Sequence, residues 1–193
     1  AAVKGLAMFK PVMKKFMSAD QLAQMEDRVA QQASQPRSFL ARHSQVVTTP
    51  ISLFIAYVIL AVIFLLAFLA TGAGISFRKT LTVTIWGSGA PAILVTLLGI
   101  LFMFVKNPAD LDVFPAYNVV SNLGALVDFV THPVLNSFLS SIDLFTIWTV
   151  VLLSIGFAAV SEKKLTARKA AIPVVCLWAL WVLLKMGFWA ILS

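Results

Sequence analysis

The sequence predicts an all-α integral membrane protein, a helical bundle with four visible transmembrane helices, and three observations lead to this prediction. Hydrophobic residues make up 60% of the 193 residues, and charged residues make up only 12%. The mean hydropathy is +0.94. Soluble domains are nearer half apolar and a quarter charged, and a chain of this length could not hide so much apolar surface in one core. Lipid must therefore surround most of the chain.

Four stretches with little or no charge predict the spans. Residues 51–70 are almost purely apolar, and twenty residues rising about 1.5 Å each cross a hydrocarbon core about 30 Å thick. Residues 80–105 form the second stretch, and residues 144–160 form a third at the short end of the permitted length. Residues 170–192 form the fourth, with Pro173 in the first turn, where its missing N–H costs least.

Small residues and proline interrupt the second span at Gly87, Gly89 and Pro91. Such residues are tolerated in membrane helices, and we expect a kink near Pro91. The small residues indicate a close approach of neighbouring helices. The alternative is a broken helix at a transport site, although such breaks usually come in matched pairs across a repeat, and the sequence shows no repeat.

Two parts of the chain are too polar to span the membrane. Residues 1–43 form a polar, amphipathic N-terminal helical segment, separate from a transmembrane domain at residues 44–193. Ser18 and Gln21 have the spacing of a capping box that starts a helix. Residues 106–141 mix acids, prolines and apolar residues, which predicts short interfacial helices on the membrane surface.

Lysine and arginine close to the spans predict the topology, because cytoplasmic loops are enriched in them. The loops after the first and third predicted spans lie on the same side of the membrane and together hold six of these residues: Arg78, Lys79, Lys163, Lys164, Arg168 and Lys169. Three such residues lie near the spans on the opposite side. We therefore expect these loops in the cytoplasm and residues 106–141 outside. Counting every basic residue of the N-terminal segment would reverse the balance, but charges far from a span orient it weakly.

The net charge of +7 does not indicate nucleic-acid binding, because the basic residues are dispersed and no aromatic-interleaved basic stripe is present. His43 and His132 lie outside the spans, and Cys176 lies in the fourth span, where we expect a buried and inert thiol. The sequence contains no zinc-protease, phosphate-loop or nucleophile-elbow motif. It predicts neither an enzyme nor a metal or cofactor site, with bound lipid left open.

Two ionisable residues near membrane depth are candidates for function. Asp143, at the start of the third span, suits ion or proton handling, or it forms with Ser140 an S-x-x-D pattern that caps the helix. Lys185 lies in the fourth span, about ten ångströms from its end. It either snorkels to the interface or pairs with Asp143.

Polar motifs at matching spacing add a resemblance. They are LSSIDLFTIWTVVLLSIGF at 139–157, KNPADLD at 106–112, SNLGA at 121–125, SFRK at 76–79 and WVLLKMG at 181–187. Together they resemble the Yip family, the Ypt/Rab-interacting-protein membrane domain, in its bacterial branch. The resemblance covers roughly Ser18 to Ser193, and it implies a five-span helical bundle with a cytoplasmic start. The first span is therefore expected upstream of Ala1.

The resemblance also limits what can be expected of function. Eukaryotic relatives are associated with Rab-type GTPases and vesicle traffic, but this sequence lacks their Asp-Leu-Tyr-Gly-Pro motif, so GTPase binding is not carried over. The bacterial branch has no settled activity to transfer. A location in the bacterial cytoplasmic (inner) membrane follows from the resemblance.

We therefore expect a non-enzymatic scaffold or accessory subunit that contacts membrane lipid and other membrane proteins in a larger complex. The acidic segment from Asp110 to Asp143, which includes Asp112 and Asn122, is the expected partner-binding surface. The alternative is a small transporter or channel with a helix broken at Pro91 and a path lined by Asp143 or Lys185.

Overall fold

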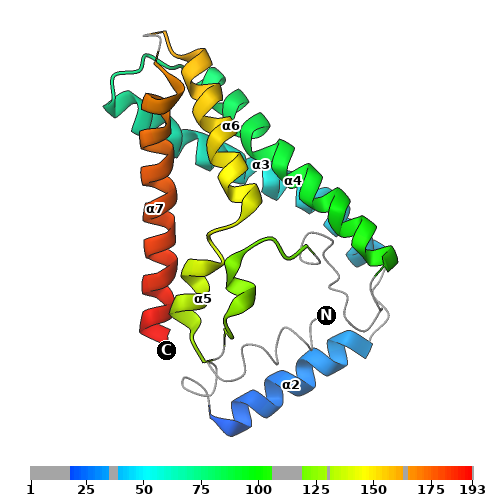
Figure 1. The fold of residues 1–193 in the computed structure, drawn as a ribbon. Helices are drawn as coiled ribbons and strands as arrows, with labels where there is room; N and C mark the ends of the chain where they lie inside the picture. Colours follow the sequence, from blue (N-terminus) through cyan, green and yellow to red (C-terminus); the bar gives the residue numbers. More distant parts are fainter. Residues whose placement is uncertain (1–17, 35–38, 106–118, 130, 163–164, 193) are drawn as a thin grey trace.

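The computed structural model describes residues 18–34, 39–105, 119–129, 131–162 and 165–192. Within these residues the predicted all-α fold is confirmed: no β-strand is present, and the one strand-like pairing is an isolated bridge between Asn122 and Asp143. Figure 1 shows the elements in order: α2 (Ala19–Ser34), α3 (Phe39–Ala70), α4 (Phe77–Val105), η3 (Leu123–Leu126), α5 (Pro133–Leu139), α6 (Leu144–Val160) and α7 (Ala167–Leu192).

Three of the described helices are long and apolar enough to cross a membrane: Val47–Ala70 within α3, the whole of α4 and the whole of α7. They make the chain an integral membrane protein. The third predicted span corresponds to α6, an apolar helix of 17 residues. At 1.5 Å per residue α6 is about 25 Å long, shorter than a hydrocarbon core of about 30 Å. The prediction of four spans therefore stays a prediction.

Three helices begin earlier than hydropathy predicts, and α4 does so by three residues, at Phe77. α3 starts at Phe39, twelve residues before the predicted span, and it continues without a break through Pro50. α7 starts at Ala167, where the Thr166 hydroxyl accepts a hydrogen bond from the Lys169 N–H (3.4 Å). Because this cap lies upstream of the apolar stretch, Pro173 is in the second turn of α7 and not in its first.

The predicted capping box opens α2. The Ser18 N–H donates to the Gln21 side-chain oxygen (3.0 Å), and the Gln21 N–H donates to the Ser18 hydroxyl (3.3 Å). Each side chain thus satisfies a backbone donor that the first turn of a helix leaves free. In Figure 1, α2 is set apart from the bundle of α3 to α7.

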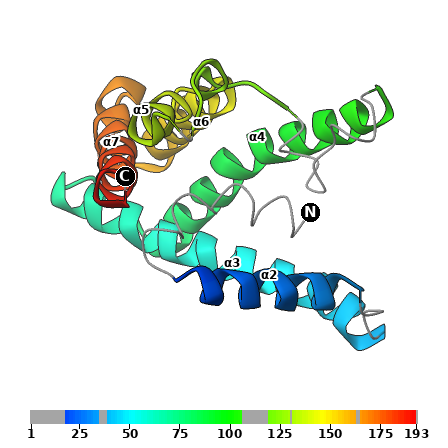
Figure 2. The same cartoon turned by 90° about the horizontal axis from the view of Figure 1, so that it is seen from below.

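The hydrophobic core lies at one end of the bundle. α6 packs against both α4 and α7, and α3 packs against α4. At the centre, the Phe157 ring of α6 contacts two rings of α3, with ring centres 4.2 Å from Phe68 and 5.2 Å from Phe64. All three phenylalanines lie toward the end of α3 or α6 that leads into a short loop. Figure 2 shows that α3 and α4 diverge away from this end.

The α3–α4 loop and the α6–α7 loop are bonded to each other, and the basic residues predicted in them include Arg78 and Lys79 of α4 and Arg168 and Lys169 of α7. Gly72 and Gly74 have φ of 70° and 63°, a backbone conformation that glycine adopts without strain, and they turn the chain from α3 into α4. In the other loop, the Ser161 hydroxyl donates to the buried Ala73 carbonyl (3.0 Å). Lys79 also pairs with Glu162 across the loops at 3.3 Å. Both loops therefore lie at one end, as the charge count requires.

Hydroxyl groups within α4 and α6 bond to the backbone of their own helix. Each donates to the carbonyl four residues earlier at 2.6–3.1 Å: Thr80, Thr82, Thr84 and Thr96 on α4, and Thr149 and Ser154 on α6. Each hydroxyl therefore has a hydrogen-bond acceptor in its own helix and needs none from a neighbouring helix.

Candidate functional site

Gly87 of the second predicted span and Gly156 of α6 form a packing seam between α4 and α6, whereas Gly89 faces α3. A Cβ added at Gly87 would lie 2.7 Å from the Leu153 side chain, and one added at Gly156 would lie 2.7 Å from Val83. Each glycine thus receives a bulky side chain from the opposite helix. α4 is one continuous helix through Pro91, which is buried. The geometry therefore shows close packing at these residues, and no interruption of the helix.

Asp143 is the N-cap of α6. Its carboxylate accepts hydrogen bonds from the Phe145 N–H (2.8 Å) and the Thr146 N–H (3.0 Å), and the Ser121 hydroxyl donates to its second oxygen. A negative charge here also complements the helix dipole. The S-x-x-D pattern predicted Ser140 as part of this cap, which is wrong. Ser140 is instead the C-cap of α5, where it donates to the Ser137 carbonyl (3.1 Å).

We call residues 119–129 and 131–143 the shelf, because they fold against the ends of α6 and α7. Backbone bonds join its first residues to the start of α6, from the Leu123 N–H to the Ile142 carbonyl (3.2 Å) and from the Leu144 N–H to the Ser121 carbonyl (3.3 Å). These bonds form the bridge that holds Asn122 beside Asp143.

A second set of bonds fixes η3 to α5 within the shelf. The Asn136 side-chain amide donates to the carbonyls of Gly124 (2.8 Å) and Val127 (2.6 Å), one at each end of the η3 region. Gly124 itself is buried, and a Cβ there would lie 2.8 Å from the Ser140 Cβ. The close approach of η3 to α5 therefore depends on glycine at this position.

Lys185 joins α7 to the shelf, but through a different partner from the one predicted. Its ammonium group donates to the Ser140 hydroxyl at 3.2 Å, and no ion pair joins it to Asp143, both residues being described. Ser140, at the end of α5, takes the bond that was predicted for Asp143. α5 also packs along α7, which brings Ser140 to this place.

Lys185→Met should lower the free energy of unfolding by about 1 kcal/mol, the net value of a typical hydrogen bond, since methionine keeps the apolar stem. In a double-mutant cycle, Lys185→Met should couple to Ser140→Ala and not to Asp143→Asn. Chemical unfolding in detergent, followed by circular dichroism, measures both cycles. A larger coupling to Asp143 than to Ser140 would contradict the geometry.

The shelf carries exposed apolar side chains although it is fixed by hydrogen bonds. The most exposed is Leu126 (81%), and Val120 and Leu123 are also exposed. Asp110 and Asp112, which the sequence also assigned to this surface, lie outside the described residues. Sequence reasoning missed Ser121 and Asn136. Both are polar residues directly after apolar neighbours, and this placement is the signal in the sequence that could have identified them.

No three His, Cys, Asp or Glu side chains among the described residues come together in a way that could hold a metal ion. Cys176, expected to be buried, is exposed on α7, which packs only one face against the bundle. The thiol therefore faces the surroundings of the helix and not its neighbours.

The Yip1 domain family matches residues 6–188, nearly the whole chain. No curated protein and no solved structure matches.

Proposed function

Because this chain belongs to the Yip1 domain family, we propose that it is a non-enzymatic scaffold or accessory subunit of a larger membrane assembly, acting through protein and lipid contacts. The resemblance to the bacterial branch adds a location in the bacterial cytoplasmic membrane to this proposal. The charge count adds an orientation, with the two basic loops in the cytoplasm and the shelf on the outer side.

One observation supports the proposal most strongly: the shelf is fixed by hydrogen bonds and exposes apolar side chains. Asp143 caps α6, Lys185 of α7 donates to Ser140, and Asn136 joins η3 to α5 within the shelf. A surface that is already ordered loses little conformational entropy when a partner binds. Its exposed apolar residues, among them Leu126, supply the contact area that a partner would cover.

The transporter alternative has less support from the same residues. Asp143 uses its carboxylate to cap α6 and to accept from Ser121, and Lys185 bonds to Ser140. Pro91 is buried within a continuous α4. Each of these groups has a structural partner or a packed position, so none is left to line a path.

Leu126→Asp should release the partner of the shelf, because a carboxylate cannot enter an apolar contact without a partner of its own. Purification in mild detergent, followed by native gel electrophoresis, should show an assembly for the wild type and a smaller species for the variant. Val105→Asp is the matched control, since Val105 is 76% exposed at the end of α4 and outside the shelf. A wild-type protein that is strictly monomeric and without partners would overturn the proposal.

A further inference from the structure

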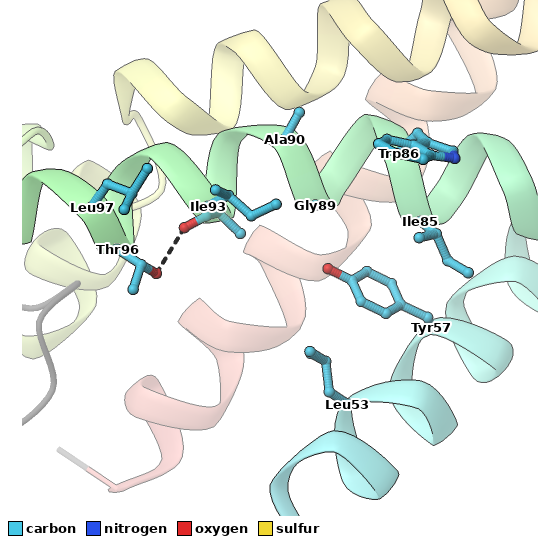
Figure 3. Close-up of a pocket in the computed structure, with 10 residues that line it drawn as sticks. Leu53, Tyr57, Ile85, Trp86, Gly89, Ala90, Ile93, Thr96 and Leu97 are labelled. Atoms are coloured by element: carbon cyan, nitrogen blue, oxygen red, sulfur yellow. Dashed lines mark hydrogen bonds between the residues drawn. The ribbon is translucent and has the colours of Figure 1, made fainter.

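A groove runs between α3 and α4, on the part of the bundle where these helices diverge. Its volume is about 520 Å³, and Figure 3 shows its lining. Leu53 and Tyr57 line it from α3, and the remaining eight residues come from α4, between Ile85 and Leu97. The groove is distinct from the shelf, which lies between α4 and α6 in the chain.

The lining of the groove is almost entirely hydrocarbon. Thr96 is one of its few polar residues, and its hydroxyl is bonded to the Ala92 carbonyl of the same helix (2.8 Å), as Figure 3 shows. Gly89 leaves the floor open: a Cβ there would meet only the Tyr57 hydroxyl, at 3.8 Å. A ligand in this groove would therefore gain from apolar contact and not from hydrogen bonds.

The groove also lies at the depth of the lipid tails. Ile85 and Leu97 are each eight residues from an end of α4, which is about 12 Å at the helical rise of 1.5 Å per residue. The lining thus occupies the middle of a helix that is long enough to cross the membrane. Phospholipid headgroups do not reach this depth, whereas their hydrocarbon chains do.

The groove is large enough for a lipid chain and too small to enclose a protein helix. The lining extends over twelve helical steps, or about 18 Å, so a volume of about 520 Å³ gives a mean cross-section of about 29 Å². Carbon atoms in contact lie about 3.5–4.0 Å apart, so one hydrocarbon chain needs roughly 12–16 Å² and fits within this cross-section. An α-helix about 10–12 Å across needs roughly 80–110 Å².

The number of lining residues also argues against a protein partner in the groove. Ten residues line the groove. A stable protein–protein interface uses roughly 20–30 residues from each partner. The groove alone is therefore too small to hold a second copy of this chain in a stable dimer.

We propose that the groove between α3 and α4 binds one hydrocarbon chain of a membrane phospholipid, seated over Gly89 and in contact with Tyr57 and Ile93. The chain fills the space that the divergence of α3 and α4 leaves, and so it completes the packing of the bundle on this side. The proposal does not depend on the scaffold function, since it involves no residue of the shelf.

Gly89→Leu tests the proposal, because the added side chain fills the floor of the groove. The probe is phosphatidylglycerol with two 18-carbon chains, added to detergent-solubilised protein and washed. Native mass spectrometry then counts the phospholipids retained. We expect about one phospholipid per wild-type chain and about tenfold weaker retention in the variant, as two or three chain carbons lose their contacts. Ile100→Phe, a change on α4 outside the groove, should retain the lipid.

A second measurement covers the case in which Gly89→Leu fails to fold. A phosphatidylglycerol with a photoreactive group at mid-chain, bound to the washed wild-type protein, should label Tyr57 and Ile93 more than Leu69 and Ile191, which are exposed elsewhere. Equal retention by both variants, or labelling spread evenly over these residues, would overturn the proposal. So would a wild-type dimer that Gly89→Leu dissociates, since a second copy would then occupy the groove.

Discussion

Gly156→Leu is expected to force α6 away from α4 and to lower the free energy of unfolding by about 3 kcal/mol, the upper end of the range for overpacking. A Cβ at Gly156 would already lie 2.7 Å from the Val83 side chain, nearer than carbon atoms approach. Val83 is 7% exposed and β-branched, so it has little freedom to rotate away. The further leucine atoms must then be accommodated by movement of the helices themselves.

The chain offers a matched control for this change. A Cβ added at Gly187 on α7 would meet nothing within 4 Å, so Gly187→Leu should be neutral or slightly stabilising, because leucine favours helix more than glycine does. Thermal unfolding in detergent, followed by circular dichroism, compares the two. Val83→Ala should relieve part of the loss caused by Gly156→Ala, since the two sites are in contact. Equal losses of stability in Gly156→Leu and Gly187→Leu would show that the contact between α4 and α6 does not cause the loss.

Asp143→Ala has the second largest expected effect, a loss of about 1.5–3 kcal/mol in the free energy of unfolding. Loss of an N-cap costs about 0.5–2 kcal/mol, and the Ser121 hydroxyl, left without its acceptor, adds a further cost of about 1 kcal/mol. Hydrogen exchange should show faster exchange at the first turn of α6 and through residues 119–123, because Asp143 holds both.

Asp143→Asn separates a structural role from ion handling. Asparagine caps a helix about as well as aspartate and keeps an oxygen that can accept from the Phe145 and Thr146 N–H groups, so the stability should change by less than about 1 kcal/mol. A carboxylate that carries ions or protons would instead lose its activity completely in this variant. Ion flux in proteoliposomes that Asp143→Asn abolishes, with stability intact, would contradict the structural role.

Sequence reasoning located elements well where one physical signal decides the boundary. α6 spans Leu144–Val160, as predicted, because an acid that can cap a helix stands directly before an uncharged apolar run. α3 was predicted too short, since hydropathy reports where lipid surrounds a helix and not where the helix begins. The polar residues between Phe39 and Pro50 are helical all the same.

Partners that are distant in sequence could not be predicted in this way. Ser121 and Asp143 are 22 residues apart, and Ser140 and Lys185 are 45 residues apart, so each pair forms only once the helices are in place. The groove over Gly89 likewise depends on the angle between α3 and α4, which the periodicity of either helix does not encode. Tyr57 had no distinguishing signal in the sequence for this reason.

The hydroxyls that bond to their own helix have a consequence for biosynthesis. Thr84 and Ser154 are buried between helices in the finished fold, yet each donates to a carbonyl one turn earlier in its own chain segment. α4 can therefore enter the bilayer during translation without exposing the Thr84 hydroxyl to lipid as an unsatisfied donor, and the Ser154 hydroxyl of α6 is satisfied in the same way. The association of α4 with α6 is then a later step that depends only on how well their surfaces fit. We therefore expect substitutions of the seam glycines to disturb assembly, and substitutions of the hydroxyl residues not to do so.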